Sequence, residues 1–396
     1  MPEVHAKLSA SGAKRWMACP PSVALEAEFP NKSSEFAEEG TQAHALAELI
    51  CRYNNSEMGK RKFNAELKKL QENKYWNEEM QGYIENYANQ VWEIFNEVKK
   101  DCKDAEILFE QRLDFSAWVE EGFGTGDVVI IADGTVQIID LKYGKGVGVS
   151  AENNPQLRLY GLGAVDTYGM LYDIEKVKMT IIQPRLDNYS TEELTVEDLV
   201  KWAEEEVRPK AELAYKGEGE YSAGDHCRFC KAKAVCRARA EENQKLAKYD
   251  FAEPPTLNPS EISDILSRID NLVKWVDDVK AYALDAILNK GIKFDGWKVV
   301  EGKSNRKYSD EVAVIAALNE GLKEVPLVLA EIYKPQELKG ITDMTKLLGK
   351  EKFEQIVGKF IIKPQGKPTL ALETDKRPEF KPVDAKSDFE EDNLLD

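Results

Sequence analysis

The pattern of apolar and polar positions along the chain predicts a mixed α/β protein. Apolar runs bounded by turn residues predict strands near residues 105–114, 123–131, 135–143 and 176–184. Apolar residues at helical spacing predict helices at 40–52, 76–100, 155–171 and 195–215. Elements in this order are typical of a mixed sheet flanked by helices.

One predicted hairpin, residues 123–143, carries acidic residues at the ends of its apolar runs. Asp127 and Asp140 are expected on its two adjacent strands. Because side chains alternate along a strand, Asp140 and Lys142 share a face. Two carboxylates and an ammonium group at one place can hold a divalent cation and activate water against a phosphodiester. The alternative is an ordinary sheet edge with solvated charges.

Four further polar residues lie at positions where elements begin or end. His44 follows Gly40 in the first long helix, and Glu110 ends a strand. Gln156 and Tyr160 are one turn apart on a helix that starts at a proline. Taken singly, His44 can cap or pack, and Gln156 and Tyr160 can line a seam between helix and sheet.

In this order the motifs resemble the RecB-like, AddB-like branch of the PD-(D/E)XK nuclease superfamily. That branch has a helix with G-x-x-x-H, then an acid, G-x-x-D, D-x-K and Q-x-x-x-Y. The matching segments here are residues 40–44, 110, 124–127, 140–142 and 156–160. The resemblance covers residues 10–240 and implies a restriction-endonuclease-like core that cleaves DNA.

The resemblance also implies a role for each of these residues. Lys142 would orient or deprotonate a water molecule and stabilise the transition state. Gln156 and Tyr160 would shape the site or position the DNA strand. The bound ion would be Mg²⁺ or Mn²⁺, which accept hard oxygen ligands with one imidazole. Its expected ligands are His44, Asp127, Asp140 and, more weakly, Glu110.

Four of the six cysteines form a second pattern. Cys19 lies near the start of the chain, and Cys227, Cys230 and Cys236 form C-x2-C-x5-C. One early cysteine and three late ones resemble the iron–sulfur staple of RecB-like nucleases, which implies a [4Fe–4S] cluster joining the ends of the nuclease domain. Tetrahedral zinc and simple free thiols are the alternatives.

The other two cysteines, Cys51 and Cys102, follow or lie on predicted helices and are expected as small core residues. A disulfide framework is not expected in a chain of this size without a secretory signal.

The net charge of −17 is unfavourable for DNA binding, because a nucleic-acid enzyme commonly has a basic face. Basic patches do occur, for example at residues 60–62. Affinity for naked DNA is therefore expected to be modest and sensitive to salt. A partner that delivers the DNA is a reasonable expectation.

The domain organisation is inferred from composition. Residues 1–250 are expected to form the nuclease domain and 251–259, which are rich in proline, a linker. A mainly helical accessory domain follows at 260–363, beginning with a long amphipathic helix from Pro259 to Asn289. The acidic tail, 364–396, is expected to be disordered. With no transmembrane stretch or signal sequence, the protein is expected in the cytoplasm, away from membranes.

The whole chain also resembles a family of phage- and prophage-encoded proteins of unknown function, in motifs such as Gly296–Lys298 and Ser304–Lys307. The expected function is therefore a DNA exonuclease of phage recombination or DNA processing. DNA, a single-strand annealing or other recombination protein, and further copies of the chain are the expected partners. One alternative is a catalytically silent nuclease fold that binds DNA or scaffolds a recombination complex. Another is a redox protein that uses the cluster for electron transfer.

Overall fold

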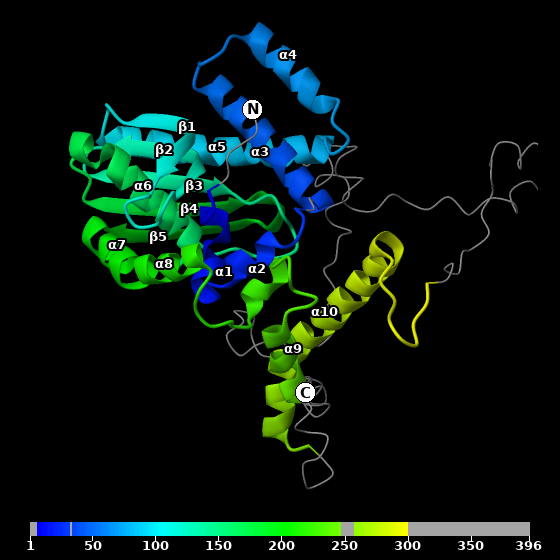
Figure 1. The fold of residues 1–396 in the computed structure, drawn as a ribbon. Helices are drawn as coiled ribbons and strands as arrows, with labels where there is room; N and C mark the ends of the chain where they lie inside the picture. Colours follow the sequence, from blue (N-terminus) through cyan, green and yellow to red (C-terminus); the bar gives the residue numbers. More distant parts are fainter. Residues whose placement is uncertain (1–5, 32–33, 247–256, 300–396) are drawn as a thin grey trace, which may run out of the picture. The chain divides into compact units, whose positions relative to one another are not determined.

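The structure is a computed structural model that describes residues 6–31, 34–246 and 257–299. Five strands form one mixed sheet in the order β1-β2-β3-β4-β5 (Figure 1). Neighbouring strands are antiparallel except β3 and β4, which are parallel and connected by helix α6 (Pro155–Tyr172). The strands are β1 Glu106–Asp114, β2 Phe123–Ala132, β3 Thr135–Leu141, β4 Lys176–Gln183 and β5 Asn188–Thr195. The predicted mixed sheet with flanking helices is confirmed.

Helices α3 (Glu35–Asn54) and α5 (Glu78–Asp101) cover one face of the sheet. Each helix begins at a residue whose side chain caps it. The Ser34 side chain accepts a hydrogen bond from the N–H of Ala37, and the Asn77 side chain accepts one from the N–H of Met80. Helix α4 (Lys60–Gln71) packs on α3 through its apolar side chains. The strand residues buried on this face include Val128, Ile130, Ile139 and Leu141.

Helix α6 crosses the opposite face of the sheet. It begins at Asn154, whose side chain accepts from the N–H groups of Gln156 and Leu157, with proline at the first helical position. The short helices η1 (Ala10–Gly12) and α1 (Ala13–Ala18) and the run α7–α8 pack on this side (Figure 1). That run comprises α7 Val196–Trp202, a π-helical turn at Ala203–Val207 and α8 Arg208–Lys216.

The cysteine region and a long helix follow the sheet. The short helix η4 (Asp225–Phe229), which carries Cys227, is followed by α9 (Arg237–Gln244), and α2 (Ser22–Ala27) lies near the start of the chain. Helix α10 (Pro259–Lys290) starts at a capping box formed by Asn258 and Glu261 and ends at Gly291, as the sequence predicts. Most of the predicted linker, the accessory domain beyond residue 299 and the tail lie outside the described residues. No described helix is long and apolar enough to cross a membrane.

Strand β5 is the strand of the sheet that the apolar pattern does not predict. Its sequence, NYSTEELT, alternates exposed and half-buried polar residues. It pairs with β4 along its whole length, from Asn188 opposite Gln183 to Thr195 opposite Lys176. The strand forms one edge of the sheet and is joined to β4 by backbone hydrogen bonds. Polar edge strands of this kind show only a weak apolar pattern in the sequence.

Candidate functional site

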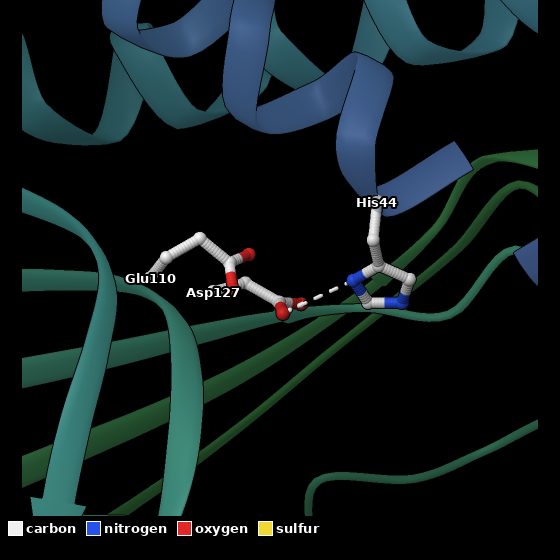
Figure 2. Close-up of side chains that lie close together, drawn as sticks. All are labelled: His44, Glu110 and Asp127. Atoms are coloured by element: carbon white, nitrogen blue, oxygen red, sulfur yellow. Dashed lines mark hydrogen bonds and ion pairs between the residues drawn. The ribbon is translucent and has the colours of Figure 1, made fainter. Parts of the chain in front are cut away.

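Three of the predicted site residues converge from three different elements. His44 comes from α3, Glu110 from β1 and Asp127 from β2 (Figure 2). One potential ligand atom from each lies within 4.8 Å of the other two. Nδ1 of His44 is 3.1 Å from Oδ1 of Asp127. All three side chains are partly buried, so the group lies in a recess and not on an open surface.

An uncommon backbone conformation places Glu110 in this group. Glu110 interrupts the β1–β2 ladder opposite Asp127 and has a φ of 51°, in the left-handed region. The carbonyl of Phe109 accepts hydrogen bonds from Nη2 of Arg52 at 3.1 Å and from Nε2 of Gln111 at 2.9 Å. A non-glycine residue in this region costs about 1–3 kcal/mol and is characteristic of functional sites. Arg52, which sequence reasoning did not select, supports the distortion.

A second cluster joins the D-x-K motif to helix α6. Nζ of Lys142 lies 2.8 Å from Oδ2 of Asp140 and donates to Oε1 of Gln156 at 3.0 Å. Nε2 of Gln156 lies 3.3 Å from Oδ1 of Asp140 and 3.2 Å from the hydroxyl of Tyr160. The backbone N–H of Leu141 donates to Oδ2 of Asp127 at 2.7 Å, which connects this cluster to the first group.

Gly124 makes room for the ring of Tyr160. A Cβ atom at position 124 would lie 2.5 Å from Cε1 of Tyr160, closer than real contacts allow. The glycine of the G-x-x-D motif is therefore explained by the approach of the ring to strand β2. Gly40 of the G-x-x-x-H motif has no such explanation, because no atom lies within 4 Å of where its Cβ would be.

The charges in the site shift one another's pKa values. Burial lowers the pKa of His44, but the Asp127 carboxylate outweighs burial and raises it to about 9. Burial raises the pKa of Asp127, and the contacts from His44, the Leu141 N–H and Lys142 bring it below its ordinary value. Burial raises the pKa of Asp140 against the opposing effect of Lys142. Burial, assisted by the charge of Asp127, raises the pKa of Glu110 to about 7.

The donor set fits a hard divalent cation. Carboxylate oxygens and one imidazole are ligands that Mg²⁺ and Mn²⁺ accept. Oδ2 of Asp140 is buried, touches Lys142, and receives no well-oriented hydrogen bond within the part of the chain that the structure describes. Of the four predicted ligands, His44, Glu110 and Asp127 form the close group, and Asp140 is held by Lys142 and Gln156.

The four cysteines of the second pattern line a single small pocket. Cys19 comes from the end of α1, and the others come from η4 and the turns after it. Three of the four are buried, and Cys236 is half-buried. Cys51 lies in the core under α3, as predicted, and Cys102 packs at its edge. The pocket contains Cys19, Cys227, Cys230 and Cys236.

Neighbours of the cysteines, which sequence reasoning missed, tie the two ends of the domain together. Glu26, 6% exposed, accepts from Nε of Arg15 at 2.8 Å and from the backbone N–H of Lys231 at 2.7 Å. Hydrogen bonds to the side chains of Cys19 and Cys227 raise the pKa of His226 to about 10. Nothing in the periodicity of the sequence marks Glu26, since its role depends on a contact across 205 positions.

Comparison with known proteins places the chain in a family. Residues 5–378 match a family described as "Protein of unknown function (DUF2800)". The chain belongs to the DUF2800 family. The match contains every site residue and the whole cysteine pocket, so both are parts of the DUF2800 region. A solved structure titled "Crystal structure of SSO0001" is similar over 58% of this chain and 95% of its own, at 14% identity and a TM-score of 0.21. Such a score carries no argument about fold or function.

Proposed function

We propose that this DUF2800 protein is a metal-dependent deoxyribonuclease with a RecB-like PD-(D/E)XK core. The observation that carries the proposal is the convergence of His44, Glu110 and Asp127 within 4.8 Å of one another, next to the Asp140–Lys142 ion pair. These residues come from four separate elements and a loop. A chance set of surface charges has no reason to be partly buried and hydrogen-bonded from this many directions.

The metal site would be formed by the carboxylates of Asp127, Asp140 and Glu110 and by the imidazole of His44. A bound Mg²⁺ or Mn²⁺ ion supplies a water molecule of lowered pKa and neutralises charge on the scissile phosphate. The protein prepares this site by orienting Asp127, whose two carboxylate oxygens contact Nδ1 of His44 and the N–H of Leu141. Each carboxylate oxygen retains further lone pairs for a cation.

Lys142 would position the attacking water and stabilise the negative charge that develops on the phosphate. Its ammonium group is held between Asp140 and Gln156, and its side chain is 26% exposed, which leaves it within reach of a substrate. Tyr160 contacts Gln156 and fixes the orientation of that amide. A preorganised cation of this kind stabilises charge in a transition state without reorganising.

We further propose that the cysteine pocket binds a [4Fe–4S] cluster. All four cysteines line one pocket, and an early cysteine with a late C-x2-C-x5-C group is the pattern of the iron–sulfur staple. Tetrahedral zinc, which also accepts four thiolates, is the alternative.

The test is a cleavage assay on end-labelled linear and closed circular DNA, single- and double-stranded. Anaerobically purified protein is assayed with Mg²⁺, with Mn²⁺ and with EDTA, and Asp127→Asn is the inactive control. We expect degradation of linear DNA that requires both metal and Asp127, and none of circles, as for an exonuclease. Cutting of circles would indicate an endonuclease. DNA binding without cleavage under any condition would contradict catalysis and favour the scaffold alternative.

A further inference from the structure

Helix α4 carries a concentration of positive charge that contrasts with the acidic chain. Its sequence, KRKFNAELKKLQ, has five cations and one acid, whereas the chain has a net charge of −17. All five cations are exposed. Of these five cations, only Lys69 forms an ion pair with another residue that the structure describes, Glu66 at 2.9 Å. The basic face of α4 is defined here as Lys60, Arg61, Lys62, Lys68 and Lys69.

The other side of α4 is already occupied. Phe63, Leu67 and Leu70 pack against the core under α3. Helical periodicity places Arg61, Lys68 and Lys69 on the opposite side, with Lys62 at its border and Lys60 nearer the apolar side. A basic amphipathic helix can also bind a membrane, and it does so most strongly when it buries its apolar face in the lipid. Because this apolar face is used inside the protein, the exposed charge suits a polyanion that binds from outside.

The first three cations do not serve the stability of the helix, whereas Lys68 and Lys69 lie in the last turn, where positive charge is favourable. Lys60, Arg61 and Lys62 occupy the first turn, where the helix dipole disfavours positive charge. Gly59 provides no side-chain cap there, and the first turn has no acidic residue. Positive charges that weaken the start of a helix are expected where function requires them.

The far end of α4 lies beside the turn of α3 that leads into the candidate site. Nε2 of Gln42 donates to the carbonyl of Leu70 at 2.9 Å, and His44 follows Gln42 on α3. Figure 1 shows α4 running alongside α3 on the outside of the domain. A strand that contacts Lys68 and Lys69 is therefore held next to the helix that supplies His44.

We propose that the basic face of α4 binds the phosphate backbone of the DNA substrate and delivers the strand to the site on α3. The inference rests on the proposed nuclease function, and it assigns a binding surface that the catalytic residues do not. It also explains how an acidic protein binds DNA, since a few contacts to phosphate suffice when they are concentrated on one helix.

The test measures the salt dependence of DNA binding by the full chain carrying Asp140→Asn, so that substrate is not consumed. The variant is the triple substitution Lys60→Gln, Arg61→Gln and Lys62→Gln. The control is Lys99→Gln, Lys100→Gln and Lys103→Gln, which change the net charge equally; these three exposed cations lie in the last turn of α5 and just beyond it. A fluorescein-labelled duplex and a single strand are the probes.

For the α4 variant we expect affinity to fall by roughly tenfold and the slope of log K against log salt to flatten by about 0.9 for each phosphate contact removed. Its melting temperature should stay the same or rise, because the first turn loses unfavourable charge. The control should bind as the parent does. Equal loss in variant and control, or a parent that does not bind DNA, would overturn the proposal.

Two further outcomes separate this inference from the nuclease function. Normal DNA binding by the α4 variant, together with normal cleavage by the same triple substitution in a chain that retains Asp140, would reject the basic face and leave the nuclease function intact. DNA binding that depends on α4, without metal-dependent cleavage, would reject the nuclease and retain the basic face. Binding to phosphatidylserine vesicles, lost in the α4 variant while DNA binding persists, would assign the face to a membrane and contradict the proposal.

Discussion

Nδ1 of His44 lies 3.1 Å from Oδ1 of Asp127 and connects helix α3 to strand β2 across 83 positions of sequence. The pair is an ion pair in the metal-free protein, because Asp127 keeps the imidazole protonated at neutral pH. The same two groups are expected metal ligands. A bound cation would therefore replace a proton at His44, which couples metal binding to pH.

The affinity for Mn²⁺ should rise with pH. The pKa of His44 is about 9, so the ring must lose a proton before it can bind metal at any lower pH. We expect the affinity to increase by about tenfold per pH unit up to pH 9 and then to level off. Glu110, whose pKa is about 7, steepens the dependence below pH 7. Electron paramagnetic resonance of free Mn²⁺ measures the affinity, and His44→Gln should flatten the profile. An affinity independent of pH would contradict the assignment of His44.

Replacement of Glu110 by glycine should stabilise the protein and impair metal binding. Glycine adopts a φ of 51° without strain but loses more backbone entropy, so the net gain in unfolding free energy is about 1 kcal/mol. Urea denaturation measures the gain. Asp173→Gly is the matched control, since Asp173 has a φ of 45° at the end of α6. It should stabilise the protein equally and leave Mn²⁺ affinity unchanged. If Glu110→Gly retains full affinity, Glu110 is not a ligand.

Gly124→Ala should act through Tyr160. The added methyl group would overlap the ring, so we expect a loss of about 1–3 kcal/mol in stability and displacement of the Tyr160 hydroxyl from Gln156. In a Tyr160→Ala background the same substitution should cost little, which a double-mutant cycle in urea measures. Gly148→Ala, with no atom within 4 Å, is the control. Additive effects of the two substitutions would show that the ring is not the cause.

The cysteine pocket gives a prediction that is independent of activity. Substitution of Cys19, Cys227, Cys230 or Cys236 by serine should remove the visible absorbance and the bound iron and sulfide of anaerobically prepared protein. Thermal stability should fall as well, because Cys19 and the late cysteines come from the two ends of the domain. Cys102→Ser, outside the pocket, should retain both properties. Stoichiometric zinc in the wild type, with no iron, would reject the cluster.

Much of the fold follows from local pattern. Four of the five strands and helices α5, α6 and α10 fall close to their predicted bounds, and α3 begins at Glu35, before the predicted 40. The sequence reveals these elements because each has apolar residues that repeat at its own period. Strand β5 escapes prediction because it pairs with β4 through backbone hydrogen bonds, which no side-chain pattern records, and NYSTEELT has few apolar side chains to reveal it.

The residues of the candidate site could be predicted from the sequence, but the contacts that hold them in place could not. The motifs select His44, Glu110 and Asp127, which the structure brings together, and Asp140 and Lys142, which form an ion pair beside them. The left-handed backbone of Glu110 and the support from Arg52 depend on contacts across 57 positions, which periodicity does not encode. For the same reason Glu26 and His226 around the cysteine pocket carried no signal.

The most direct test of the proposed mechanism compares the DNA cleavage rates of two site variants with that of a control variant at a nearby position. Asp140→Asn and Lys142→Met remove the two charges of the buried pair, and Lys145→Met removes an exposed charge in the following loop. With linear DNA and saturating Mn²⁺ we predict that the first two lose at least about 10²-fold in rate and stay folded by circular dichroism, while Lys145→Met cleaves with a similar single-turnover rate. Cleavage at the wild-type rate by Asp140→Asn or Lys142→Met would contradict the mechanism.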